Sequence, residues 1–83
     1  MKVEVTLRYL HRTLKEIKTS EEIPEGCTAG ELSASIIKAH EKREGIEFAG
    51  ASIVTLVNGR LVTKETLLHD GDEVKIMPVA AAG

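Results

Sequence analysis

The sequence is poor in aromatic residues: its 83 residues include one Phe, one Tyr and no Trp. The core must therefore be mainly aliphatic, and a small aliphatic core rarely encloses a deep cofactor pocket. Base-stacking side chains are scarce too, and the eleven Lys and Arg are spread among thirteen Asp and Glu, for a net charge of -2. These features argue against a self-sufficient enzyme and against nucleic acid as a partner.

Cysteine is almost absent as well, since Cys27 is the only one and no disulfide can form within the chain. This usage is typical of a cytoplasmic protein. Residues 1–5 alternate charged and apolar side chains as a strand does, so we expect no signal peptide there. No apolar run approaches the roughly 20 residues of a membrane-spanning helix, so we expect no membrane partner.

The first segment alternates apolar and polar side chains from residue 2, which predicts a half-buried strand. Its apolar members are Val3, Val5, Leu7 and Tyr9. Residues 13–19 are the expected hairpin partner, but Leu14 and Ile17 are out of phase for a flat strand. A bulge that resets the register is predicted there.

The best-marked helix begins after Thr28, because Thr28 and Glu31 have the spacing of a capping box. Cys27 and Leu32 are placed to form a hydrophobic staple, and Gly45 is a natural stop. The expected buried stripe consists of Ala29, Leu32, Ile36 and Ala39, with Ser33 facing water. A reactive thiol near a helix N-terminus is an alternative role for Cys27, and the staple explains that residue without chemistry.

The second half of the chain reads as three strands joined by tight turns. The predicted elements are a strand at 53–57, an Asn58-Gly59 hairpin turn, a short strand at 60–62, a turn at 69–72 and a strand at 73–77 that Pro78 ends. The three histidines lack metal-ligand spacing, so no metal site is predicted.

The element order predicts an α+β domain over residues 1–79, followed by a flexible tail at 80–83. Four to five strands form a mixed sheet, and one main helix packs across one face. The first and last strands are expected side by side and parallel at the centre.

Two stretches carry a resemblance to a known family: Val57-Asn58-Gly59-Arg60-Leu61-Val62, and residues 68–78, which read L-H-D-G-D-E-V-K-I-M-P. With the small-residue tail, they resemble the sulfur-carrier family of ubiquitin-like proteins. That family includes the small subunit of molybdopterin synthase and the sulfur carrier of the thiamine pathway. The resemblance implies a ubiquitin-like β-grasp fold.

The resemblance also implies a function as a carrier rather than an enzyme. An E1-like activating enzyme would use ATP to adenylate the carboxylate of Gly83, which sulfur then converts to a thiocarboxylate. The sulfur would pass to the large subunit of a cofactor synthase, or an equivalent acceptor, in molybdopterin or thiamine biosynthesis. The chain itself would bind no cofactor. The residues implied to enter the partner's channel are Val79, Ala80, Ala81 and Ala82, and the expected docking residues are Leu61, Val62 and Met77.

One position departs from the family pattern, because Ala82 stands where the family has its penultimate glycine. A Cβ there narrows the allowed backbone and adds bulk at the narrowest part of a channel. Three interpretations of Ala82 stay open. The partner enzyme has adapted to alanine at this position, the chain is a family member with a changed role, or the natural chain carries one further glycine after Gly83. A ubiquitin-like protein modifier and a non-covalent β-grasp interaction module are the alternative functions.

Overall fold

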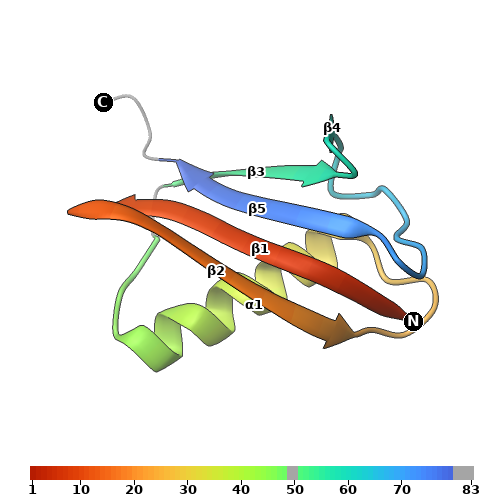
Figure 1. Ribbon diagram of the computed structural model, residues 1–83, viewed down its shortest axis with the longest axis horizontal. Helices are drawn as coiled ribbons and strands as arrows, with labels where there is room; N and C mark the ends of the chain where they lie inside the picture. Colours follow the sequence, from red (N-terminus) through yellow and green to blue (C-terminus); the bar gives the residue numbers. More distant parts are fainter. Residues whose placement is uncertain (49–50, 80–83) are drawn as a thin grey trace.

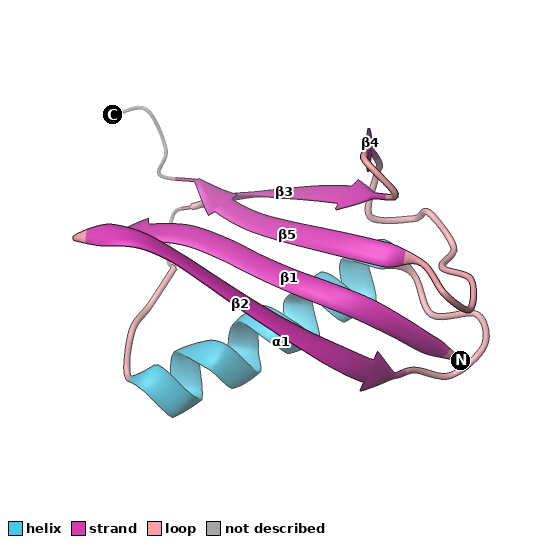
Figure 2. Cartoon of the chain, in the orientation of Figure 1, coloured by secondary structure: helices cyan, strands magenta, loops and turns pink. Residues whose placement is uncertain are grey.

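The computed structural model describes residues 1–48 and 51–79. In that part of the chain, five strands form a single mixed sheet in the order β2-β1-β5-β3-β4, and one helix, α1, packs across one face (Figures 1 and 2). The elements are β1 (Lys2–His11), β2 (Thr13–Glu22), α1 (Ala29–Glu44), β3 (Ser52–Val57), β4 (Arg60–Leu61) and β5 (Glu73–Val79). This architecture confirms the ubiquitin-like β-grasp fold that the sequence predicted.

The β1–β2 hairpin is regular along its whole length. Its antiparallel register runs unbroken from Lys2 opposite Glu22 to His11 opposite Thr13, and Arg12 turns the chain with φ of 67°. The predicted bulge is therefore wrong. Leu14 and Ile17 differ by an odd number of positions, so they lie on opposite faces of the strand. Leu14 is exposed on the face away from α1, called here the outer face.

Strand β5 occupies the centre of the sheet. It pairs in parallel with β1 from Glu4 opposite Glu73 to Leu7 opposite Ile76, as expected, and antiparallel with β3 as far as Ser52 opposite Val79. Pro78 does not end the strand as predicted. It lies two positions beyond Ile76, the last residue of β5 that pairs with β1, so its missing N–H interrupts no pairing there.

The ends of α1 follow the predicted signals. The Thr28 hydroxyl accepts a hydrogen bond from the Glu31 N–H (3.2 Å) and donates one to the Glu31 carboxylate (3.1 Å). Gly45 ends the helix in the left-handed conformation (φ 67°), where its N–H donates to the Glu41 carbonyl (2.9 Å). A glycine tolerates this conformation without steric cost.

The buried face of α1 differs from the predicted stripe. Its buried residues are Ala29, Leu32, Ser33, Ile37 and His40, whereas Ile36 is half-buried and Ala39 is exposed. Two polar residues thus belong to the buried face. Their burial is possible because each has a polar partner: the Ser33 and Thr55 hydroxyls are hydrogen-bonded at 2.9 Å, and His40 bonds to Tyr9.

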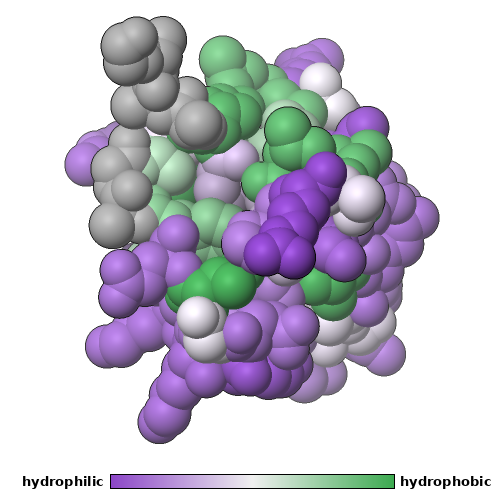
Figure 3. All heavy atoms as spheres, turned by 90° about the vertical axis from the view of Figure 1, so that its left-hand side faces the viewer, coloured by the Kyte–Doolittle hydropathy of each residue, from purple (hydrophilic) through white to green (hydrophobic). Residues whose placement is uncertain are grey.

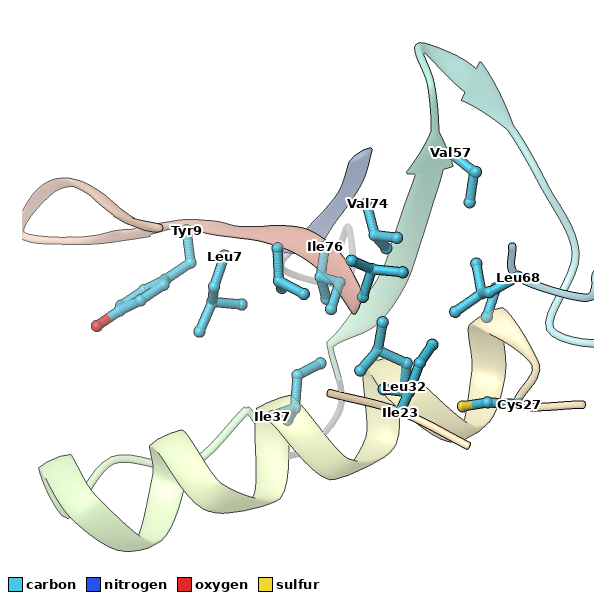
Figure 4. Close-up of a cluster of buried hydrophobic side chains, with 13 residues drawn as sticks. Leu7, Tyr9, Ile23, Cys27, Leu32, Ile37, Val57, Leu68, Val74 and Ile76 are labelled. Atoms are coloured by element: carbon cyan, nitrogen blue, oxygen red, sulfur yellow. The ribbon is translucent and has the colours of Figure 1, made fainter. Parts of the chain in front are cut away.

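The core lies between α1 and the inner face of the sheet, and aliphatic side chains dominate it (Figure 4). Its sheet residues are Val3, Val5, Leu7, Tyr9, Val57, Val74 and Ile76, and the helix and loops add Ile23, Cys27, Ala29, Leu32, Ile37 and Leu68. The strand alternation predicted for β1 is confirmed, because all four of its predicted apolar residues are buried.

Candidate functional site

The Asp70-Gly71-Asp72 turn anchors the start of β5 next to the start of β1. The Asp70 carboxylate accepts a hydrogen bond from the Lys2 N–H (2.7 Å), and Gly71, with φ of 85°, donates its N–H to the Lys2 carbonyl (2.8 Å). The Asp72 carboxylate accepts from the His69 N–H (2.8 Å). The turn thus sets the register between β1 and β5 and directs β5 across the middle of the sheet.

The Asn58-Gly59 turn holds the same end of β5 from the other side. Asn58 has φ of 52°, as a type I′ turn requires, and its side-chain oxygen accepts from the Glu73 N–H (2.9 Å). Its side-chain nitrogen donates to the Asp72 carboxylate (2.9 Å). The residues of the sequence motif therefore position β5 from its N-terminal end, far along the strand from Val79.

At the opposite end, β5 carries the chain out of the sheet. Val79 pairs with Ser52 and is 44% exposed, so the central strand remains paired up to the last residue that the structure describes. Of the four predicted channel residues, the structure describes only Val79, which it places at the end of β5. Ala80, Ala81 and Ala82, and the predicted reactive carboxylate of Gly83, lie outside the described residues. Strand β5 therefore ends at one end of the molecule, on the same side as the tip of the β1–β2 hairpin (Figure 1).

An apolar groove of about 360 Å³ lies where β5 ends. Arg8, Tyr9, Leu10, Leu14, Met77, Pro78 and Val79 line it. Leu10 and Leu14 pair across the hairpin and are 78% and 56% exposed. Figure 3 looks onto this end of the molecule, where hydrophobic side chains lie among hydrophilic ones. Exposed apolar surface of this kind, rimmed by polar residues, is typical of a protein-docking site.

The three predicted docking residues do not share one surface. Met77 is half-buried on the outer face and lines the apolar groove. Leu61 lies opposite Leu56 on the same face and is 73% exposed. Val62 instead packs against the core, where its N–H donates to the Thr55 carbonyl (3.1 Å).

Sequence reasoning missed Leu10 and Leu14. The detectable signal was an apolar residue on each side of a predicted turn, placed in the polar phase of the hairpin. A leucine in that phase has no place in the core, so it must be exposed or contact a partner.

The other half of the outer face is charged. A second groove, of about 430 Å³, is lined by Glu4, Glu16, Lys18, Glu73 and Lys75, together with Val5, Thr6, Thr19, Leu56, Gly59 and Val74. Arg8 and Lys18 each lie 3.9 Å from the Glu16 carboxylate. The outer face is thus apolar toward the end of β5 and mixed in charge toward its start.

An aromatic cluster closes the core beneath the hairpin tip. The Tyr9 hydroxyl and His40 Nε2 are 2.7 Å apart, and the Tyr9 ring meets the Phe48 ring edge to face, with 5.0 Å between centroids. Burial lowers the pKa of His40; nearby Glu44 opposes that shift, and Arg43 adds to it. Burial also raises the pKa of Tyr9. Both side chains are therefore neutral at pH 7, and they support the strand that bears Leu10.

Cys27 is buried, which agrees with its predicted staple role. Burial, and secondarily the charge of Glu31, raise the pKa of its thiol. A raised pKa disfavours the reactive thiolate. Across residues 1–48 and 51–79, no group of three or more His, Cys, Asp or Glu side chains is placed to hold a metal ion. The helix in this part of the chain is too short and too polar to span a membrane.

The family model of the ThiS family matches residues 9–83, which include β5 and the residues after it. The chain belongs to the ThiS family. Its membership confirms the sulfur-carrier, ubiquitin-like resemblance seen in the sequence. A search of curated proteins found no significant match.

Solved structures agree with the ThiS assignment. Subunit 1 of a candidate molybdopterin converting factor from Pyrococcus furiosus is 32% identical, with 94% of this chain and 99% of that chain covered and a TM-score of 0.53. A complex of subunits 1 and 2 of the molybdopterin-converting factor from Helicobacter pylori matches over 100% of both chains, at 24% identity and a TM-score of 0.61. SAMP1 from Haloferax volcanii matches over 100% of both chains, at 19% identity and a TM-score of 0.64. The last two show the shared fold alone.

Proposed function

We propose that this ThiS-family chain is a cytoplasmic carrier of sulfur as a C-terminal thiocarboxylate for the synthesis of a molybdopterin-type cofactor. An E1-like activating enzyme binds ATP and transfers AMP to the carboxylate of Gly83, and pyrophosphate leaves. A sulfur donor then displaces AMP, and the large subunit of a synthase accepts the sulfur. The chain supplies the carboxylate and the docking surface, and its partners supply ATP binding and acid–base groups.

The observation that carries the proposal is the family match that extends through residue 83. The structure supports it in a second way, because the central strand leads directly to this segment and an apolar groove lies beside the point of exit. The Pyrococcus furiosus relative favours the molybdopterin branch over the thiamine branch.

Intact-mass spectrometry tests the chemistry directly. We expect incubation with an activating enzyme, ATP and a sulfur donor to replace one oxygen of the chain by sulfur. Deleting Gly83 should abolish the product, and Ala82→Gly should form it at a rate similar to wild type. No mass change with the activating enzymes of either pathway would overturn the proposal. Covalent ladders on target lysines, without sulfur transfer, would instead support a protein modifier.

The docking part of the proposal has its own test at Leu10. Leu10→Glu places a charge in the apolar groove, and Leu67→Glu is the matched control, since Leu67 is an exposed leucine away from the groove. Leu10 is 78% exposed and Leu67 55%, so a purely structural effect should be larger at Leu67. Losing one buried leucine costs about 2 kcal/mol, so we expect Leu10→Glu to weaken binding to the synthase subunit more than about tenfold. Equal effects of both substitutions would refute this docking site.

A further inference from the structure

The outer edge of β2 presents ten residues of strand backbone that pairs with β1 on one side only. Met1 and Ile23 exchange two hydrogen bonds of 2.8 Å, from the Ile23 N–H to the Met1 carbonyl and from the Met1 ammonium to the Ile23 carbonyl. In an antiparallel ladder, such pairs alternate with pairs that make no bonds. Odd-numbered residues of β2 therefore bond to β1, and the N–H and C=O groups of even-numbered residues point outward. Those residues are Leu14, Glu16, Lys18, Ser20 and Glu22.

No described strand of this chain pairs with these outward groups. An open edge of this length is a template for another strand. Beside it, a cleft of about 180 Å³ lies between β2 and α1, lined among others by Ile17, Ile36, Ala39 and His40. The edge therefore combines free backbone groups with a partly apolar flank.

The charges along β2 select its partner. If a second β2 pairs antiparallel about a two-fold axis at Ile17, Glu16 of each copy lies opposite Lys18 of the other. Both residues have outward backbone groups, so they form the hydrogen-bonded pairs, and both side chains lie on the outer face. Opposite charges in directly opposed positions stabilise a sheet. Leu14 then faces Ser20, and the two Ile17 side chains meet on the inner face.

In neighbouring registers of the β2–β2 pairing, side chains of like charge would lie opposite each other. An axis at Glu16 places two glutamates together, an axis at Lys18 places two lysines together, and an axis at Thr19 places Glu16 opposite Glu22 twice. A shift of the register by an odd number of residues would place residues with outward backbone groups opposite residues whose backbone groups point toward β1. It would also exchange the two faces of one strand relative to the other. An axis at Ser20 would place Lys18 opposite Glu22, but it joins only residues 18–22 of β2, whereas an axis at Ile17 joins residues 13–21. Lysines on an edge usually prevent pairing; here the charges and the length of the overlap together favour the axis at Ile17.

We propose that β2 is a homodimerisation edge, which pairs antiparallel with β2 of a second copy of this chain with Ile17 at the two-fold axis. The pairing joins two five-stranded sheets into one continuous sheet. It leaves β5 uncovered, because β1 separates β2 from β5 in each copy. The proposed pairing therefore leaves Val79, the last described residue of β5, uncovered in each copy.

Charge reversal at Glu16 and Lys18 tests the register in the full chain. Both side chains are exposed, at 41% and 75%, so the substitutions should preserve the fold, which circular dichroism checks. Sedimentation equilibrium should give wild type a mass of about twice 9.0 kDa at high concentration. Glu16→Lys and Lys18→Glu should each raise the dimer Kd at least about tenfold, because two attractive pairs become repulsive. The double swap should restore it.

A monomer at every concentration, or a dimer insensitive to both reversals, would overturn the proposal and leave the edge to another partner. Failure of the double swap to restore the dimer would also overturn it, since Lys18 would then oppose something other than Glu16. None of these results depends on sulfur transfer, so they leave the proposed carrier function untouched.

Cysteine cross-linking gives an independent test. Ile17→Cys places two thiols across the axis in a pair without backbone bonds, where Cα atoms are about 4.5 Å apart, within the reach of a disulfide. Thr19→Cys is the control, because its two copies would lie four residues out of register, roughly 14 Å apart. We expect oxidation to cross-link Ile17→Cys and not Thr19→Cys. The reverse pattern, or no cross-link in either variant, would refute the register.

Discussion

Replacing Tyr9 by Phe removes the one hydrogen bond that the His40 ring makes within the described residues. The Tyr9 hydroxyl lies 2.7 Å from His40 Nε2, and His40 Nδ1, which is buried, has no partner in this part of the chain. The ring of residue 9 and its contact with Phe48 persist in the variant, so the change isolates one polar contact.

The cost follows from leaving a buried polar atom without a partner. His40 is 2% exposed, so water does not replace the lost contact readily. An unsatisfied buried nitrogen costs about 1–3 kcal/mol, and each kcal/mol lowers the Tm of a domain of this size by roughly 4–8 °C. We expect Tyr9→Phe to lower the free energy of unfolding by about 2 kcal/mol and the Tm by about 10 °C.

The double variant Tyr9→Phe/His40→Leu is the decisive comparison. It removes both polar groups together and fills the same space with apolar atoms, which can be nearly neutral. Urea and thermal unfolding, followed by circular dichroism, should show the double variant more stable than Tyr9→Phe alone. A Tyr9→Phe protein within about 0.5 kcal/mol of wild type, or a double variant less stable than either single one, would refute the reasoning.

The hydrogen-bonded pair of Tyr9 and His40 also predicts that the stability of the protein depends on pH. Burial lowers the pKa of His40 below its ordinary 6.5, so the unfolded chain binds a proton at His40 more readily than the folded chain does. The free energy of unfolding is therefore undiminished above about pH 6.5, and it decreases as the pH drops through the pKa of His40 in the folded protein. Wild type should lose more stability between about pH 7.5 and about pH 5.5 than Tyr9→Phe/His40→Leu, which keeps the other histidines; equal losses in urea titrations would contradict this. Gly30→Ala should cost about 1–3 kcal/mol in unfolding experiments, because its Cβ would lie 2.5 Å from Lys64 Cβ and 2.9 Å from the Lys64 carbonyl oxygen. Asn58→Ala should cost about 2 kcal/mol, since Ala tolerates the left-handed φ of 52° less well than Asn does and two hydrogen bonds are lost. Cys27 should react with a thiol reagent slowly in the native protein and rapidly in urea; fast native labelling would refute its burial.

Features encoded by neighbouring residues were predictable from the sequence. The alternation in β1 identified its buried side chains, and the Thr28–Glu31 spacing located the start of α1. The Asn58-Gly59 pair located a turn with positive φ. Each of these signals is a pattern of residues a few positions apart, so the local sequence contains the relevant information.

Features that depend on distant partners were mispredicted or missed. Ser33 is buried because Thr55, twenty-two positions away, supplies a hydrogen bond. Pro78 continues β5 because β1 stops pairing before it, and no local rule reports where a neighbouring strand ends. The predicted bulge at Leu14 followed from the assumption that this leucine is buried. Its exposure, beside Leu10 and the end of β5, could not be predicted from the sequence.

The sequence by itself determined the order of elements, because periodicity, caps and turn residues act over short separations. Its resemblance to the sulfur-carrier family implied the β-grasp architecture. Only the tertiary structure decided which surface accompanies the end of β5. The parallel pairing of β1 with β5 brings residues 10 and 14 beside residues 77 and 79. Val62 packs against the core instead, where its N–H bonds to the Thr55 carbonyl. The tertiary structure also decided that β2 lies at an open edge with its outward backbone groups at Glu16 and Lys18. Strand order is set by contacts between residues far apart in the chain, which one-dimensional patterns do not record.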